Sequence, residues 1–139
     1  MKNWFYLLIA TSLLLIDQIV KYLSIKKPFP ETEGFLINSC NFNIAWSIPI
    51  NEILFWTIWT GIILTILYSL LKSFDLFLLI VLFGAISNII DRITKGCVVD
   101  YINLYSFPTF NIADIMITGG IILFFLKDLL SQSRKKTKQ

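Results

Sequence analysis

Four long apolar runs constrain this chain more than any other feature of its sequence. They cover about residues 4–23, 53–71, 74–93 and 112–130. Each is close to the roughly 20 residues that a helix needs to cross the hydrocarbon core of a bilayer. The chain is 56% hydrophobic, with a mean hydropathy of +0.74, which is too apolar for an ordinary water-soluble domain. We therefore expect an all-α membrane protein with four transmembrane helices, in a single integral membrane domain over residues 1–139.

The first run has the short basic start of a signal peptide, but no small-residue cleavage site ends it and Asp17 interrupts it. We expect it to be retained as a helix. The basic residues Lys2 and Lys72 and those of the tail 133–138 all fall on one side of a four-helix topology. Positive charge collects on the cytoplasmic side, so both termini are expected there. Three lysines weaken this signal without reversing it: Lys26, Lys27 and Lys95.

Two segments, about 24–52 and 94–111, are left on the outer face. Within them, residues 34–39, 43–48 and 97–105 look strand-like, since they are rich in β-branched and aromatic residues between turn signals. The sequence therefore predicts a small β-rich extracytoplasmic cradle beside the helices.

Nearly every ionisable or amide side chain inside the apolar runs falls at one depth, in the outer third of the predicted bundle. These residues are Asp17, Lys21, Asn88, Asp91, Arg92, Asn111 and Asp114, and the outer segments add Asn41 and Asp100. A charge within a bilayer costs roughly 2.5–3.5 kcal/mol on insertion scales, so such residues usually mark a function. Their shared depth predicts a polar site that faces the bundle interior or the outer surface.

Each of these residues also has a structural explanation, and several remain open at this point. Asn111 and Asp114 have the spacing of a helix capping box, and Asp17 and Lys21 can pair at i, i+4. Asp91 beside Arg92 suits a buried ion pair that fixes helix packing. Asp100 could be a solvated strand-end residue, and the remaining amides could satisfy backbone groups: Asn41 and Asn88. None of these explanations accounts for the shared depth.

The composition excludes much of the usual chemistry of enzymes. The chain has no histidine, so Ser-His and Cys-His pairs and His-ligated metals are impossible. No phosphate-binding GxxxxGK[ST] loop is present, and a net charge of +3 gives little support for a nucleic-acid partner. The simplest hydrolytic device left is a pair of aspartates that share one proton, in which one acts as base and the other as acid. Asp100 and Asp114 are the best candidates, because both come from the same outer region.

The two cysteines, Cys40 and Cys97, both fall on the outer side. A disulfide is possible in an oxidising compartment, but sequence gives no distance between them and the question stays open. As nucleophiles they would lack a histidine base. Two non-enzymatic interpretations also remain: a small proton-relay or transport protein, which should have polar residues continuing to the inner side, and a structural or chaperone-like membrane subunit.

Five short blocks, in this order along nearly the whole chain, resemble those of lipoprotein signal peptidase (signal peptidase II), a family of bacterial membrane aspartyl proteases. The blocks are "DQIVK" (17–21), "NFNIAWS" (41–47), "GAISNIIDR" (84–92), "VVDYI" (98–102) and "FNIAD" (110–114). The resemblance implies an endopeptidase that removes the signal peptide from diacylglyceryl-modified prolipoproteins. Cleavage would come before the lipidated lipobox cysteine, at the outer face of the bacterial cytoplasmic (inner) membrane.

The resemblance also implies roles for individual residues. Asp100 and Asp114 would form the catalytic dyad, without metal or cofactor. Substrate-binding or supporting roles would fall to Asn41, Asn88, Arg92, Asn111, Asp17, Lys21 and Asp91. The expected partners are the lipid-modified prolipoprotein and membrane lipids. We expect a monomer with no nucleic-acid partner.

Three positions depart from the family's pattern. Asn43 replaces a usual glycine, and Phe83 and Ser87 replace usual small residues on either side of the retained Gly84. Asn43 can adopt left-handed backbone angles as glycine does. Phe83 puts a large ring where a small residue would allow close helix approach, so helix packing near that point is expected to differ.

Overall fold

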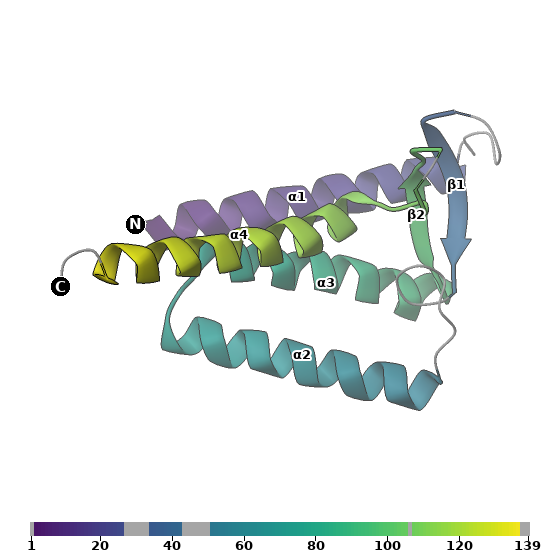
Figure 1. The fold of residues 1–139 in the computed structure, drawn as a ribbon. Helices are drawn as coiled ribbons and strands as arrows, with labels where there is room; N and C mark the ends of the chain where they lie inside the picture. Colours follow the sequence, from purple (N-terminus) through teal and green to yellow (C-terminus); the bar gives the residue numbers. More distant parts are fainter. Residues whose placement is uncertain (1, 27–33, 43–50, 106, 137–139) are drawn as a thin grey trace.

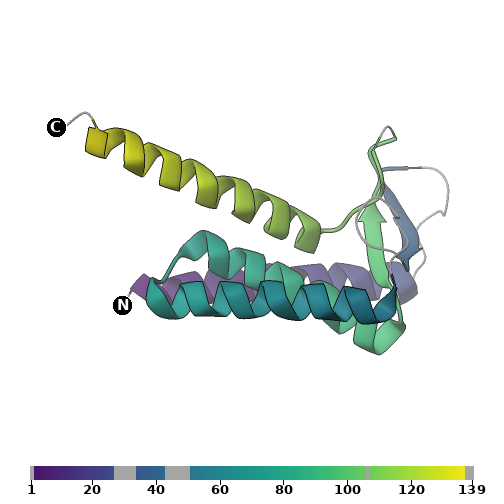
Figure 2. The same ribbon diagram turned by 60° about the horizontal axis from the view of Figure 1, so that its bottom comes forward.

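The computed structural model describes residues 2–26, 34–42, 51–105 and 107–136, without the side chains of Lys2, Lys135 and Lys136. Its elements, in chain order, are α1 (Lys2–Lys26), β1 (Leu36–Asn41), α2 (Glu52–Lys72), α3 (Leu76–Lys95), β2 (Val98–Ile102) and α4 (Ile112–Lys136). The helices run roughly along one direction, with the two strands at one end (Figure 1). The start of α1 and the end of α4 lie at the opposite end, and the turned view in Figure 2 shows the same arrangement.

The structure is mostly helical with a small sheet, as the sequence predicts. In the part of the chain that is described, three helices are long and apolar enough to cross a membrane: Asn3–Lys26, Glu52–Lys72 and Leu76–Lys95. Large apolar side chains point outward along the helices, and Trp4, Ile53 and Leu71 are each more than three-quarters exposed. Water-soluble proteins rarely expose apolar surface on this scale, so lipid contact explains it. That α4 forms a fourth span stays a prediction.

Helix α3 lies at the centre of the packing and contacts each of the other helices. It begins at the N-cap Asp75, whose carboxylate accepts from the backbone N–H of Phe77 (2.8 Å) and Leu78 (3.2 Å). It ends at Gly96, whose φ of 77° is the left-handed conformation that glycine adopts without strain. The core of the bundle forms around Ile66, Val81 and Leu82. The polar residues near the end of α3 are therefore held on a buried helix.

The two strands pair antiparallel, with Ser39 opposite Asp100. An isolated bridge between Ile102 and Phe110 then brings the chain back to the start of α4. The predicted strands at 34–39 and 97–105 overlap β1 and β2, whereas the one predicted at 43–48 lies outside the described residues, as does Asn43. The sheet thus holds Asp100 at the same end of the bundle as the first turn of α4.

Two glycines bring α3 and α4 into close contact. A Cβ atom placed on Gly84 would lie 2.7 Å from the carbonyl oxygen of Ala113. One placed on Gly120 would lie 2.6 Å from Cγ2 of Val81 and 2.9 Å from the carbonyl oxygen of Phe77. Small residues at such crossings let helix backbones approach closely. The close approach therefore falls at the retained glycine, beside the half-buried Phe83.

Gly120→Ala is expected to destabilise the protein, because its methyl group would overlap backbone and side-chain atoms of α3. Overpacking of this kind costs about 1–3 kcal/mol. The adjacent glycine is a matched control, since a Cβ on Gly119 meets nothing within 4 Å. Gly119→Ala should leave the unfolding temperature unchanged or raise it, because alanine favours helix by about 1 kcal/mol over glycine. Thermal unfolding of both variants in detergent checks this, and an equal effect would contradict the packing described here.

Candidate active site

Asp100 and Asp114 lie at the same end of the bundle, the end that carries the sheet. Asp100 lies in β2 and is only 2% exposed. Asp114 lies in the first turn of α4 and is half-buried. Asn111 joins them, since its side-chain nitrogen donates to Oδ1 of Asp100 (2.7 Å) and its backbone N–H donates to Oδ2 of Asp114 (3.2 Å). The two carboxyl groups that the sequence singles out therefore share one neighbouring residue.

Asn111 and Asp114 also form the capping box that their spacing predicts. The backbone N–H of Asp114 donates to Oδ1 of Asn111 (2.9 Å), which complements the bond from the Asn111 backbone to Asp114. A capping box satisfies two backbone donors at a helix start. A role in capping α4 and a role in the candidate site are compatible for these two residues, because the bonds that begin α4 also hold both side chains in place.

Two further asparagines point amide nitrogens at the carboxylates. Asn88 donates from Nδ2 to Oδ1 of Asp114 (2.8 Å), and Asn41 donates from Nδ2 to Oδ2 of Asp100 (3.2 Å). Each carboxyl group thus accepts from two residues that lie on different elements. Such bonds fix where the oxygens point without adding a counter-charge.

Lys21 holds the Asn88 side chain in one orientation. Its Nζ donates to Oδ1 of Asn88 (2.9 Å) and pairs with Asp17 (2.7 Å) and Asp91 (2.8 Å). An ammonium group has three hydrogens, so all of them are used, and Lys21, Asp17 and Asp91 are fully buried. Because Oδ1 of Asn88 faces a cation, its Nδ2 is the atom that faces Asp114. The predicted pairing of Asp17 with Lys21 is present.

The prediction that Asp91 pairs with its neighbour Arg92 is replaced by another arrangement. Asp91 pairs with Lys21 and with Lys95 (2.7 Å), one turn further along α3. The guanidinium of Arg92 lies 4.5 Å from the ring centre of Phe55, and the charges of Asp100, Asp114 and Asp91 all act on it. Residues next to each other on a helix point in different directions, so Arg92 contacts Phe55 of α2 while Asp91 contacts Lys21 of α1.

Three residues of this network do not stand out in the sequence. Tyr101 donates from its hydroxyl to Oδ1 of Asp17 (2.8 Å), and that hydroxyl accepts from the backbone N–H of Ile112 (3.1 Å). Burial and the charge of Asp17 raise the pKa of Tyr101, so it remains a donor. The others are Gln18 and Lys95, which both contact Oδ1 of Asp91. The only hint in the sequence was that Tyr101 follows the candidate Asp100. Its partner, Asp17, lies 84 positions away and could not be read from the sequence.

Ser87, one of the departures from the family's pattern, also takes part. Its hydroxyl is fully buried and donates to Oδ2 of Asp17 (2.6 Å), and it accepts from the side chain of Gln18 (2.8 Å). A hydroxyl at this position therefore extends the hydrogen bonding around Asp17.

Cys40 and Cys97 form a disulfide, with their Cα atoms 5.6 Å apart. This answers the question that the sequence left open. The bond joins the strand that carries Asn41 to the segment that leads into β2, so it ties both sides of the Asp100 neighbourhood together. In the part of the chain that is described, no group of three or more metal-ligating side chains lies together.

The pKa of Asp100 is raised by burial and by the charge of Asp114, from 3.8 to about 7. A carboxyl group with a raised pKa contributes stability at low pH, and that contribution is lost as the pH rises through the folded-state value. We expect the unfolding temperature of the wild type to fall relative to that of Asp100→Asn between about pH 4 and pH 8. The free-energy difference should reach at most about 4 kcal/mol.

Thermal unfolding across this pH range measures the effect. Asp128→Asn is the control, because Asp128 is exposed on α4 and bonds only to Gln132 among the described residues. It should follow the wild type at every pH. A constant difference between the wild type and Asp100→Asn across the range would show that Asp100 titrates normally.

The comparisons with known proteins decide the family. The sequence profile of the family described as "Signal peptidase (SPase) II" matches residues 9–130. The chain belongs to the signal peptidase II family. Membership makes it a protease of a bacterial membrane, and the matched segment contains all nine residues of the predicted site.

Curated relatives and solved structures agree with the signal peptidase II assignment. A lipoprotein signal peptidase of Bacillus subtilis (strain 168) is 31% identical over 152 residues, which cover 96% of this chain and 99% of that protein. One of Staphylococcus aureus (strain JH9) is 37% identical over 151 residues, covering 96% and 93%. Two solved structures described as bacterial membrane enzymes are also similar. The first has a TM-score of 0.79 at 32% identity over 94% of this chain and 90% of that one, and the second has 0.73 at 31% over 89% and 92%.

Proposed function

We propose that this chain is an aspartyl endopeptidase that removes the signal peptide from diacylglyceryl-modified prolipoproteins. It would cut the peptide bond before the lipidated lipobox cysteine. The proposal is supported above all by the convergence of Asp100 and Asp114 on Asn111, at one end of a bundle whose helices are otherwise largely apolar. The relatives named lipoprotein signal peptidase support the substrate class.

In the proposed reaction the two carboxyl groups share one proton. The ionised carboxylate takes a proton from water, and the oxygen of that water attacks the carbonyl carbon of the scissile bond. The protonated carboxyl then gives its proton to the leaving nitrogen, so that the C–N bond breaks. The products are a signal peptide with a new carboxylate and a lipoprotein with a free cysteine amine. A pKa near 7 for Asp100 suits a group that holds a proton at neutral pH.

The side chains around the dyad would serve substrate binding. Arg92 interacts with both carboxylates and would contribute positive charge as they titrate. Asn41 lies at the end of β1, which is an edge strand of the two-stranded sheet that the structure describes, and such an edge would accept an extended peptide. The buried group Lys21, Asp17 and Asp91 would act indirectly, by holding Asn88 against Asp114.

The proposed topology has four transmembrane helices, both termini in the cytoplasm and the carboxyl groups at the outer face. The end of α2, at Lys72, and the end of α4, which carries Arg134, lie at the end of the bundle away from the sheet, where the positive-inside tendency would place the cytoplasm. The lipid on the substrate cysteine would remain in the bilayer while its peptide bond reaches the sheet end.

The test uses the purified full-length chain with one precursor in two forms, with and without the diacylglyceryl group. We expect cleavage of the modified form only, with a new N-terminus at the lipidated cysteine detected by mass spectrometry. Equal cleavage of both forms would overturn the lipid requirement. Failure to cut either form would overturn the proposed function.

A further inference from the structure

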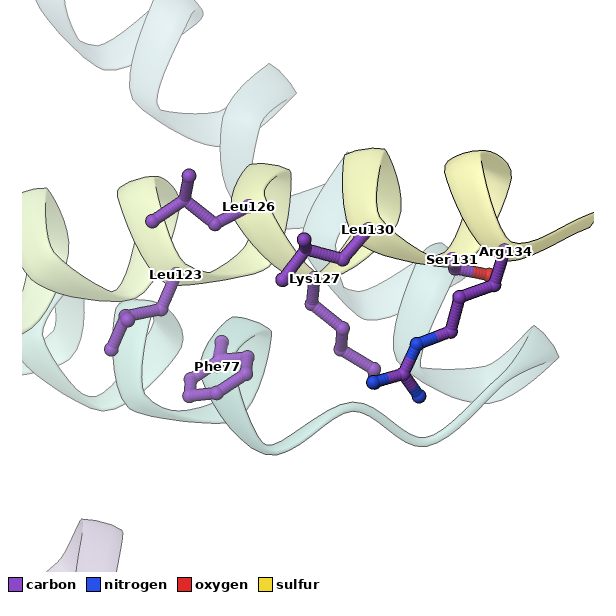
Figure 3. Close-up of a pocket in the computed structure, with 7 residues that line it drawn as sticks. All are labelled: Phe77, Leu123, Leu126, Lys127, Leu130, Ser131 and Arg134. Atoms are coloured by element: carbon purple, nitrogen blue, oxygen red, sulfur yellow. The ribbon is translucent and has the colours of Figure 1, made fainter. Parts of the chain in front are cut away.

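A second site-like feature lies at the end of the bundle away from the carboxylates. It is a groove of about 530 Å³ between the start of α3 and the last half of α4 (Figure 3). Its apolar part is lined by Phe77, Leu123, Leu126 and Leu130. Lys127, Ser131 and Arg134 also line it, through the apolar atoms of their side chains, so its surface is almost wholly apolar. None of these residues takes part in the proposed reaction.

The polar residues share one face of α4. Lys127, Ser131 and Arg134 follow each other at spacings of four and three residues, which puts them on one stripe of a helix. In Figure 3 the side chains of Lys127 and Arg134 both point to the same end of the groove, while Phe77 and Leu123 lie toward the other end. The groove itself is therefore apolar, and the charged tips of Lys127 and Arg134 lie at one end of it, its cationic end.

The cationic end retains positive charge after its internal contacts are counted. Lys127 pairs with Asp75, but its side chain is 59% exposed, and an ammonium group has two further hydrogens to donate. Arg134 is exposed and offers a planar fork of donors that fits a phosphate. Among the side chains that the structure describes at the groove, two cations against one carboxylate leave about one positive charge.

We propose that this groove binds an anionic phospholipid, with an acyl chain along Phe77, Leu123, Leu126 and Leu130 and its phosphate at Lys127 and Arg134. The separation of apolar and cationic surface matches the two parts of such a lipid, and a bilayer supplies it at high concentration. The groove would lie in the inner leaflet, and this placement rests on the topology that is part of the proposed function. Each basic residue next to a membrane helix raises the affinity for an anionic lipid by about five-fold.

The experiment measures lipid binding to the purified full-length chain in neutral detergent, by native mass spectrometry. The titrants are phosphatidylglycerol and phosphatidylcholine with identical acyl chains, and glycerol phosphate as the headgroup without chains. We expect phosphatidylglycerol to bind at least about five-fold more tightly than phosphatidylcholine, and glycerol phosphate to bind much more weakly. Equal binding of the two lipids, or equally tight binding of glycerol phosphate, would overturn the proposal.

Three variants locate the site. Arg134→Gln should weaken phosphatidylglycerol binding about five-fold and phosphatidylcholine binding little. Leu130→Trp, at a position that is 64% exposed, should fill the apolar part and weaken both lipids. Lys72→Gln removes the same charge from the same end of the bundle outside the groove, and should bind as the wild type does. If Lys72→Gln and Arg134→Gln behave alike, the cations act only as a diffuse surface charge and the groove assignment is wrong. Because these residues lie far from the carboxylates, cleavage of the lipidated precursor tests the proposed function separately.

Discussion

Asp100→Asn and Asp114→Asn are each expected to abolish cleavage of a lipidated prolipoprotein. An amide can neither take a proton from water nor give one to the leaving amine, so either change removes half of the acid–base pair. General acid–base groups contribute about 10²–10⁴-fold, and both steps need the pair, so the loss should reach at least the upper part of that range. Initial rates on the diacylglyceryl-modified precursor measure it.

Both variants should remain folded. Asparagine keeps an oxygen that can accept from Asn111 or Asn88 in place of the carboxylate. Asp128→Asn is the matched control, since it makes the same chemical change at an exposed position of α4, and its cleavage rate should equal that of the wild type. A folded Asp100→Asn or Asp114→Asn variant that cuts within a few-fold of the wild-type rate would refute the dyad.

Lys21→Met is expected to give the largest loss of stability. The change removes the cation that pairs with Asp17 and Asp91, and all three side chains are fully buried. Asp91 keeps Lys95, but Asp17 is left with only neutral donors among the described residues. Breaking a buried ion pair in this way costs about 3–5 kcal/mol, which corresponds to a fall in Tm of about 10 °C or more.

The control for Lys21→Met is Lys26→Met, because Lys26 is exposed at the end of the same helix. Its effect on thermal unfolding should be small. The double variant Asp17→Asn/Lys21→Met should recover part of the lost stability, because it removes the unpaired charge as well. A single Lys21→Met variant that unfolds at the wild-type temperature would mean that the buried network contributes nothing to the fold.

The sequence alone predicts a structural feature when the interactions that produce it are local in the chain or are imposed by the surrounding lipid. Lipid contact requires apolar helix surfaces, so the hydropathy pattern alone indicates a helical membrane protein. The pairing of Asp17 with Lys21 follows from one turn of a helix. The bonds between Asn111 and Asp114 follow from the chemistry of a helix start. Each of these contacts joins residues three or four positions apart.

Other features depend on residues far apart in the chain. Asp91 has a neighbouring cation in Arg92, but it pairs with Lys21 of α1, because α1 packs against that face of α3. The disulfide likewise joins two cysteines 57 positions apart. Gly119 and Gly120 cannot be told apart in the sequence. Only the crossing of α3 and α4 shows that a side chain at Gly120 would clash with α3, whereas one at Gly119 would not.

By itself the sequence determined that the chain forms apolar helices, and it singled out two aspartates, Asp100 and Asp114, as candidates for one site. Only the tertiary structure decided which atoms meet: that Asn111 contacts both carboxyl groups, and that Lys21 turns the amide of Asn88 toward Asp114. The physical reason is range. Hydropathy and helix periodicity act over a few residues, whereas hydrogen bonds between side chains require positions set to within a few tenths of an ångström by packing between distant segments.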